Sequence, residues 1–142
     1  MVKTKSKVIF QTGKRRLAIA RAKAVAGMGM VRINSKPLDA WGTEPMRLWV
    51  KEPLMLAGDL ASKVDIDVNV KSGGIVGQAE AIRMAVARAL VEFSKGEQLR
   101  NLFMQYDRNM LVYDPRRNET HHGSGRGASK RGSRRHKQRS KR

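Results

Sequence analysis

The chain has 142 residues, a length that suits one domain with extensions. It carries 30 Lys and Arg against 12 Asp and Glu, and this net charge of +18 predicts polyanionic partners. The lack of Cys excludes disulfides and Cys-based zinc sites, and no run approaches the roughly 18 apolar residues of a membrane span. No signal peptide is indicated either, so we expect an intracellular protein without a membrane partner.

The positive charge is concentrated at the two ends of the sequence. Residues 1–38 hold ten basic residues and no acid, residues 39–120 hold eleven basic and twelve acidic residues, and residues 121–142 hold nine basic residues and no acid. A nearly neutral middle is therefore flanked by cationic ends. This distribution predicts a globular body over residues 1–120 and an extended basic tail over residues 121–142.

The first predicted element is a hairpin near the N-terminus. Residues 15–26 are rich in Ala, which favours a helix, but residues 17–26 alternate Ala with larger side chains, which favours a strand. A glycine-containing turn at residues 27–29 would then lead into a second strand at residues 31–34. In this hairpin Arg21 and Lys23 would share one face, and the all-alanine face would admit a helix or a phosphate backbone closely.

The middle of the chain predicts helices and one strand. Between residues 39 and 60, Pro45 and Pro53 each suit the first turn of a short helix. Residues 64–70 alternate apolar and polar side chains, which predicts a half-buried strand. Apolar residues at helical spacing from Ile75 to Phe93 predict a helix that ends at Gly96.

Two further elements follow. Residues 97–106 have the spacing of a shorter amphipathic helix, and residues 110–113 are predicted to form a strand.

Motifs for catalysis are lacking. Residues 74–77 match the GxxG pattern of KH domains, but uncharged Ile75 and Val76 favour a strand-to-helix turn that begins an apolar helix face. Contact between the helix N-terminal amides and an RNA phosphate is a second possibility. Asp65 and Asp67 are interpreted as a solvated strand face, because no nucleophile or metal ligand stands beside them. We expect no enzyme activity, no cofactor and no small-molecule substrate.

The tail differs in composition from the body. From residue 123 onward it contains Gly, Ser, Arg and Lys but no apolar residue larger than Ala, so it cannot form a core. A solvated tail without a role is the alternative to a phosphate-binding tail, which we favour because arginine pairs bidentately with phosphate. All seven aromatic residues lie outside the tail, so we expect it to contact nucleic-acid backbone rather than to stack on bases.

Three segments resemble a known family: GKRRLAIARAKAVAGMGMVRIN at residues 13–34, GGIVGQAEAIRMAVARAL at residues 73–90, and QRSKR at residues 138–142. They resemble the universal family of small-subunit ribosomal protein nine, and YDRNMLVYDPRR at residues 106–117 resembles its archaeal and eukaryotic branch. The resemblance implies an α+β fold called ribosomal-protein-S-five-domain-two-like, with a four-stranded sheet and helices packed on one face.

The family resemblance also implies a structural role in translation, in the head of the small ribosomal subunit. The expected partners are small-subunit rRNA, peptidyl-site tRNA and neighbouring ribosomal proteins of the head, and the expected location is cytoplasmic and ribosome-bound. The predicted rRNA-binding residues are Lys14, Arg15, Arg16, Arg21, Lys23, Lys130, Arg131, Arg134, Arg135 and Lys137. The predicted tRNA-binding residues are Arg139, Lys141 and Arg142, of which the last two match the terminal pair of the family.

Two other functions fit part of the sequence. An architectural DNA-binding protein would also have a high positive charge and a flexible basic end. An RNA-processing nuclease on a similar fold would need ordered carboxylates able to hold a metal ion.

Overall fold

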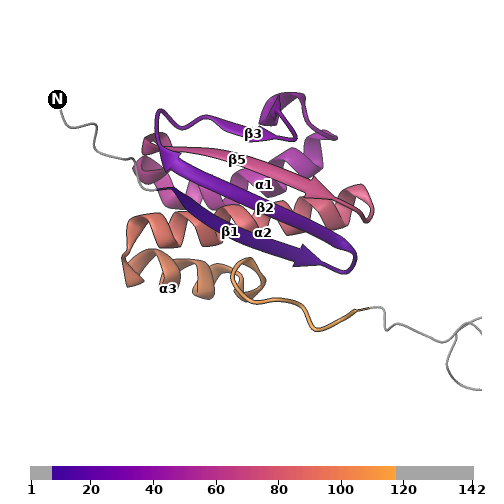
Figure 1. Ribbon diagram of the computed structural model, residues 1–142. Coiled ribbons are helices and arrows are strands. Elements are labelled where there is room, and N and C mark those ends of the chain that lie inside the picture. The colour runs from indigo at the N-terminus through magenta and orange to yellow at the C-terminus, as the bar shows by residue number, and fades with distance from the viewer. Residues whose placement is uncertain (1–7, 118–142) are drawn as a thin grey trace, which may run out of the picture.

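Five strands form one mixed sheet in residues 8–117, the part of the chain that the computed structural model describes (Figure 1). The strands are β1 (Ile9–Arg15), β2 (Ala18–Ala26), β3 (Val31–Ile33), β4 (Lys36–Pro37) and β5 (Val64–Lys71), in the spatial order β1-β2-β5-β3-β4. The strand predicted at residues 64–70 is confirmed. The predicted count of four strands is wrong, because the two-residue β4 adds a fifth strand beside β3.

The predicted pairing of residues 17–26 with residues 31–34 is also wrong. β2 pairs antiparallel with β1 on one side and with β5 on the other, whereas β3 runs parallel to β5. The chain therefore passes around the end of β5 between β2 and β3. Backbone hydrogen bonds hold this passage: the amide of Gly27 donates to the carbonyl of Lys63 at 2.9 Å, and the amide of Ile66 donates to the carbonyl of Met30 at 2.8 Å.

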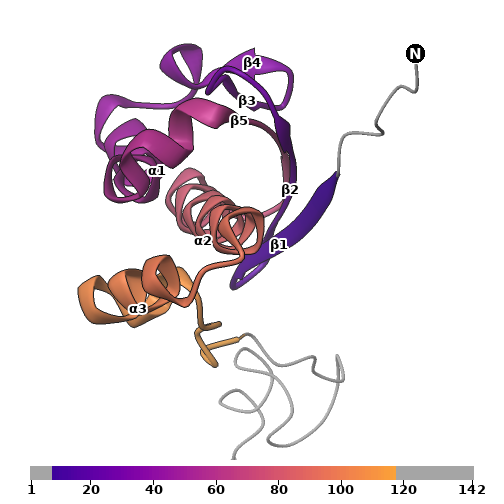
Figure 2. The same cartoon turned by 90° about the vertical axis from the view of Figure 1, so that its left-hand side faces the viewer.

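Three α-helices cover one face of the sheet, as predicted (Figure 2). They are α1 (Glu44–Ala57), α2 (Ile75–Ser94) and α3 (Glu97–Tyr106), with short 3-10 helices η1 (Leu38–Ala40), η2 (Gly58–Lys63) and η3 (Arg108–Met110). The two helices predicted after β5 are thereby confirmed. No helix in the described part of the chain is long and apolar enough to cross a membrane.

The two short helices predicted at Pro45 and Pro53 are one helix, α1. Pro45 lies in its first turn, as predicted, but Pro53 lies inside it. A proline inside a helix removes one backbone hydrogen bond. Pro53 is fully buried, so apolar burial of its ring offsets that loss, a contribution that depends on tertiary packing.

The predicted strand-to-helix turn lies between β5 and α2. Gly74 is the N-cap of α2, and Gly73 adopts a positive φ of 73°. A Cβ atom on Gly73 would lie 2.9 Å from the Cβ of Ala18, so glycine permits this close approach. Ile75 and Val76 are about half exposed, so the expectation that they begin the apolar face of the helix is wrong.

The strand predicted at residues 110–113 does not form. Met110 ends the 3-10 helix η3 and is fully buried, and residues 111–117 follow as an irregular segment beside β1. Their carbonyls and side chains bond to arginine side chains rather than to a neighbouring strand, as described below.

The core lies between α2 and the alanine face of β2. Ala18, Ala20, Ala22 and Ala24 are at most 1% exposed, and the sheet curves around α2 (Figure 2). Small residues on both sides allow the helix to approach the sheet closely. The closest point is Gly13 of β1, where a Cβ atom would lie 1.9 Å from the carbonyl oxygen of Ala81 and 2.7 Å from the amide nitrogen of Ala85.

Replacing Gly13 with Ala should therefore destabilise the protein by about 1–3 kcal/mol, because β1 has to move away from α2. The measurement is urea unfolding, with a lower midpoint and an unchanged m-value. Gly77→Ala is the matched control. A Cβ atom there meets its nearest neighbour at 3.7 Å, and alanine favours helix, so this variant should be as stable as the wild type or more stable. Equal destabilisation by both substitutions would contradict the proposed role of Gly13.

Candidate nucleic-acid interface

The sheet has one face that points away from the helices, which we call the outer face. Its side chains alternate along each strand with residues of the core. The outer face consists of Phe10, Ile19, Arg21, Lys23, Arg32, Asp67, Asn69 and Lys71, all of which are exposed. Four cations share this surface with one exposed carboxylate, Asp67. Asp65, on the same face of β5, is half-buried and accepts hydrogen bonds from backbone amides.

Arg21 and Lys23 lie on the outer face together, as predicted from the alternation of β2. In the strand register Arg21 lies beside Asn69, and Lys23 lies between Phe10 and Asp67. The sequence analysis missed Arg32 and Lys71, which the sheet brings to the same surface from β3 and β5. Strand alternation could have placed each on an exposed face, but only the strand order puts Lys71 beside β2 and Arg32 one strand further across the same surface.

The exposed carboxylate of the outer face, Asp67, does not neutralise this surface. Asp67 lies 3.8 Å from the Nε of Arg32, and both side chains are more than half exposed. Solvent and salt screen such a pair strongly. Three cations of the outer face remain beyond this pair, and a phosphate can compete for Arg32 as well.

Lys14 and Arg16 lie at the border of the sheet. Lys14 is half-buried near the end of β1, close to Tyr113. Arg16 is exposed in the turn between β1 and β2, with a positive φ of 51°. It lines a hollow of about 410 Å³ together with Gly73 and Gly74 at the start of α2. In the register of β1 and β2, Lys14 lies opposite Ile19 and so points to the same side of the sheet as the outer face, whereas Arg16 lies in the turn beyond the two strands.

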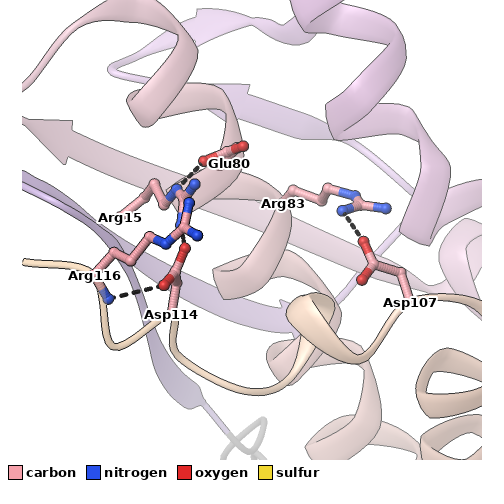
Figure 3. Close-up of polar contacts among 6 residues, drawn as sticks. All are labelled: Arg15, Glu80, Arg83, Asp107, Asp114 and Arg116. Atoms are coloured by element: carbon pink, nitrogen blue, oxygen red, sulfur yellow. Dashed lines mark hydrogen bonds and ion pairs between the residues drawn. The ribbon is translucent and has the colours of Figure 1, made fainter.

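Arg15 is engaged within the protein. Its guanidinium forms ion pairs with Glu80 of α2 and with Asp114 of the segment after α3 (Figure 3). Its side chain is only 23% exposed. Arg15 therefore connects β1, α2 and the C-terminal part of the body, and its charge is already compensated by two carboxylates.

A second arginine, Arg83 of α2, reinforces this connection. Its Nη1 lies 2.6 Å from Oδ2 of Asp107 (Figure 3). Its Nη2 lies 2.5 Å from Oε2 of Glu52 in α1. Arg83 is more buried than either partner, so the pairs are less screened than those on the surface.

Arg88 of α2 binds the backbone of the segment that follows α3. Its guanidinium donates to the carbonyl of Leu111 at 2.8 and 3.0 Å and to the carbonyl of Thr12 at 3.0 Å. It also lies 4.0 Å from the ring centroid of Tyr113, a cation–π distance. Burial would raise the pKa of the Tyr113 hydroxyl, but the hydrogen bond to Thr12 and the charge of Arg88 outweigh burial and lower it.

These arginine contacts were missed by the sequence analysis. Arg88 and Thr12 are 76 residues apart, and no local pattern links such distant positions. We refer to residues 107–114, held by Arg15, Arg83 and Arg88, as the C-terminal strap.

Asp65 has a specific structural contact rather than the solvated position expected. Its Oδ1 accepts hydrogen bonds from the backbone amides of Met28 and Met30, both at 2.9 Å. Hydrogen bonds from Met30 and then Met28 lower the pKa of Asp65 below its ordinary value of 3.8. Asp65 thus holds the turn that carries the chain from β2 to β3.

The predicted site residues of the tail lie outside the described residues. They are Lys130, Arg131, Arg134, Arg135, Lys137, Arg139, Lys141 and Arg142.

Comparison with known proteins identifies the family. Residues 13–142 match the family described as Ribosomal protein S9/S16. The chain belongs to this family. Ribosomal proteins of this family are structural components and not enzymes, which agrees with the expected lack of catalysis.

Archaeal members of the ribosomal protein S9/S16 family are close in sequence. The small ribosomal subunit protein uS9 of Pyrobaculum aerophilum is 51% identical over 113 residues, which cover 80% of each chain. Those of Methanococcus vannielii and Methanococcus maripaludis are 45% and 47% identical over 115 residues, which cover 81% of this chain and 86% of theirs. The resemblance to this family and to its archaeal branch is therefore confirmed.

The contact made by Asp65 predicts a pH-dependent effect of its removal. A lowered folded-state pKa means that the ionised carboxylate stabilises the folded state above the unfolded-state pKa, near 3.8, and that this stabilisation is lost as the pH falls through the folded-state value. Asp65→Ala should thus lower the urea midpoint at pH 7 and change it little at pH 2.

The control is Asp67→Ala, two residues further along the same strand face, where the carboxylate accepts no backbone hydrogen bond within residues 8–117 and its ion pair with Arg32 is exposed. This variant should unfold almost as the wild type does at pH 7. If it lost as much stability as Asp65→Ala, or if the effect of Asp65→Ala were the same at both pH values, the assigned role of the Asp65 hydrogen bonds would be wrong.

Proposed function

We propose that this protein binds small-subunit rRNA with the outer face of its sheet and acts as a structural part of the small ribosomal subunit. The observation that carries the proposal is the gathering of Arg21, Lys23, Arg32 and Lys71 on one surface against one exposed carboxylate, Asp67. The relatives are named as small-subunit proteins, which supports the assignment to that subunit.

Contacts to phosphate explain why cations gather on this surface. Each Lys or Arg that neutralises a phosphate releases condensed counterions, and arginine adds bidentate hydrogen bonds. Such contacts position a protein on RNA without reading its sequence. Lys14 extends the contact along β1 and Arg16 extends it into the turn after β1, whereas Arg15 acts through the C-terminal strap, which holds β1 in place.

The second part of the proposed function concerns the tail, to which we assign contacts with rRNA and tRNA. With a body of residues 1–120 and a tail of residues 121–142, we propose that the tail follows rRNA and that its last residues reach the tRNA in the peptidyl site. The rRNA contacts are assigned to Lys130, Arg131, Arg134, Arg135 and Lys137, and the tRNA contacts to Arg139, Lys141 and Arg142. Nine basic residues without an acid support contact with phosphates.

The family also supports the remaining assignments. We propose that the fold is the ribosomal-protein-S-five-domain-two-like fold with an added edge strand. We further propose that the protein is bound to cytoplasmic ribosomes beside other proteins of the subunit head.

Replacing both Arg21 and Lys23 with Ala should weaken binding to small-subunit rRNA and reduce its salt dependence. Two lost phosphate contacts lower the slope of log K against log salt by roughly 1.5–2. The measurement is filter binding of the full chain across a salt series. Arg100→Ala with Arg108→Ala is the charge-matched control, because both are exposed on the helical side, and it should leave the slope nearly unchanged. Equal slopes for the two double variants would refute binding by the outer face.

Deleting residues 140–142 should leave incorporation into small subunits intact and weaken retention of peptidyl-site tRNA. Loss of charge-assisted hydrogen bonds should raise the tRNA dissociation rate about tenfold. Purified subunits carrying the deleted chain are compared with subunits carrying Lys141→Arg, which keeps the charge and should retain tRNA normally. An unchanged dissociation rate after the deletion would contradict the tRNA contact.

A further inference from the structure

An aromatic ring lies among the cations of the outer face. Phe10 does not belong to the core. The side chain of the preceding residue, Ile9, is buried at 3% exposure, and strand alternation turns Phe10 to the opposite face, where it is 70% exposed. It is the most exposed aromatic side chain in the described part of the chain. Its ring contributes little to folding, because most of its surface remains in water.

The position of Phe10 in the sheet places it beside the basic residues. Phe10 is paired in register with Lys23, and Arg21 lies two residues further along the same face of β2. Next to the ring is a hollow of about 470 Å³ that crosses four strands and the turn after β3. Its lining includes Phe10, Arg21, Lys23, Arg32, Ser35 and Asn69.

We infer that the outer face holds an unpaired RNA nucleotide, with its base stacked on Phe10 and its adjacent phosphates on Arg21 and Lys23. This inference rests on the proposed rRNA-binding function and specifies which part of the RNA the outer face takes. The amide of Asn69, exposed in the same hollow, can donate to or accept from a base edge. The hollow lies in the size range of small-ligand sites.

The chemistry of the surface favours a single-stranded segment of RNA over a duplex. In a duplex both faces of each base are stacked on other bases, so a protein ring cannot reach them. An unpaired base exposes its π-face, and aromatic side chains on an open sheet surface bind such bases in RNA-binding modules. The stacking also needs a ring that the fold leaves uncovered, a condition that Phe10 meets.

The same chemistry favours RNA over an acidic protein segment. An acidic peptide would satisfy Arg21 and Lys23 but would leave the exposed ring without a planar partner. A nucleotide supplies both a negative phosphate and a flat apolar surface, so one ligand uses all three side chains.

The fluorine NMR spectrum of the full chain labelled with 4-fluorophenylalanine tests this inference directly. The sequence contains only three Phe residues, of which Phe103 is fully buried and Phe93 half-buried, so the three signals are few and distinct in environment. The Phe10 signal is assigned with the Phe10→Leu variant. The probes, each in excess, are single-stranded oligoadenylate, duplex RNA of the same length, and polyglutamate.

Oligoadenylate should shift the Phe10 signal while the signals of Phe93 and Phe103 stay in place. Duplex RNA and polyglutamate should shift it much less. The inference is overturned if oligoadenylate leaves the Phe10 signal unshifted, or if duplex RNA shifts this signal as much as oligoadenylate does. It is also overturned if polyglutamate shifts the Phe10 signal equally, a result that would indicate an acidic protein partner.

Affinity measurements separate this inference from the proposed function. At raised salt, where phosphate contacts contribute less, Phe10→Ala should weaken binding of oligoadenylate by about 5- to 150-fold, and Phe10→Trp should preserve it. The salt slope should be the same in both variants. If the Phe10→Ala variant bound oligoadenylate as tightly as the wild type, stacking would be refuted. This would hold even if the double variant Arg21→Ala, Lys23→Ala lowered the salt slope of rRNA binding. An unchanged slope in that double variant would instead refute the proposed function.

Discussion

The close approach of α2 to the first two strands is the constraint on which the body depends. At Gly13 the backbone of α2 lies so near to β1 that there is no room for a side chain, and the alanines of β2 leave a similarly shallow surface beside it. Dispersion contacts are gained over the whole length of this interface because the two backbones are close. The helix therefore covers the inner side of β1, β2 and β5, and both charged side chains of β2 lie on the other face.

This one-sided packing separates the charges of the body. The acids of the middle region do not neutralise the outer face, because several of them are used on the helical side. Glu80 and Asp114 pair with Arg15, and Glu52 and Asp107 pair with Arg83. Three of the four outer-face cations, Arg21, Lys23 and Arg32, come from residues 1–38, which contain no acid. The fold therefore gathers the excess charge of the N-terminal region on one side of the body, while these carboxylates are engaged on the other.

The ion pairs also determine where the described chain runs after α3. Arg15, Arg83 and Arg88 come from β1 and α2, and together they hold the C-terminal strap against the edge of the sheet. Polar groups at the border of β1 are satisfied here: Arg88 of α2 and the Tyr113 hydroxyl of the strap both donate to the carbonyl of Thr12, which has no neighbouring strand on that side. Irregular backbone can lie here because the guanidinium groups replace the hydrogen bonds that a further strand would supply.

The amino-acid sequence by itself determined the elements with a strong local period. The strand at residues 64–70 and the helix from Ile75 follow from alternation and helical spacing, and the shared face of Arg21 and Lys23 follows from strand geometry. The family was also recognisable from sequence, because its segments are contiguous. These features depend on neighbours within about four residues along the chain.

The tertiary structure alone decided which strands pair and which side chains meet. β5 lies between β2 and β3, so the backbone groups on both of its edges are hydrogen-bonded. The alternation of β2 shows which of its side chains share a face, but it carries no information on which strand lies beside β2. Pro53 stays inside α1 because its ring is buried, and Asp65 is engaged because the turn at Met28 and Met30 passes its carboxylate. Arg15 could be recognised as basic from the sequence, but only the fold shows that its charge is compensated, because its partners are dozens of residues away and meet it through packing.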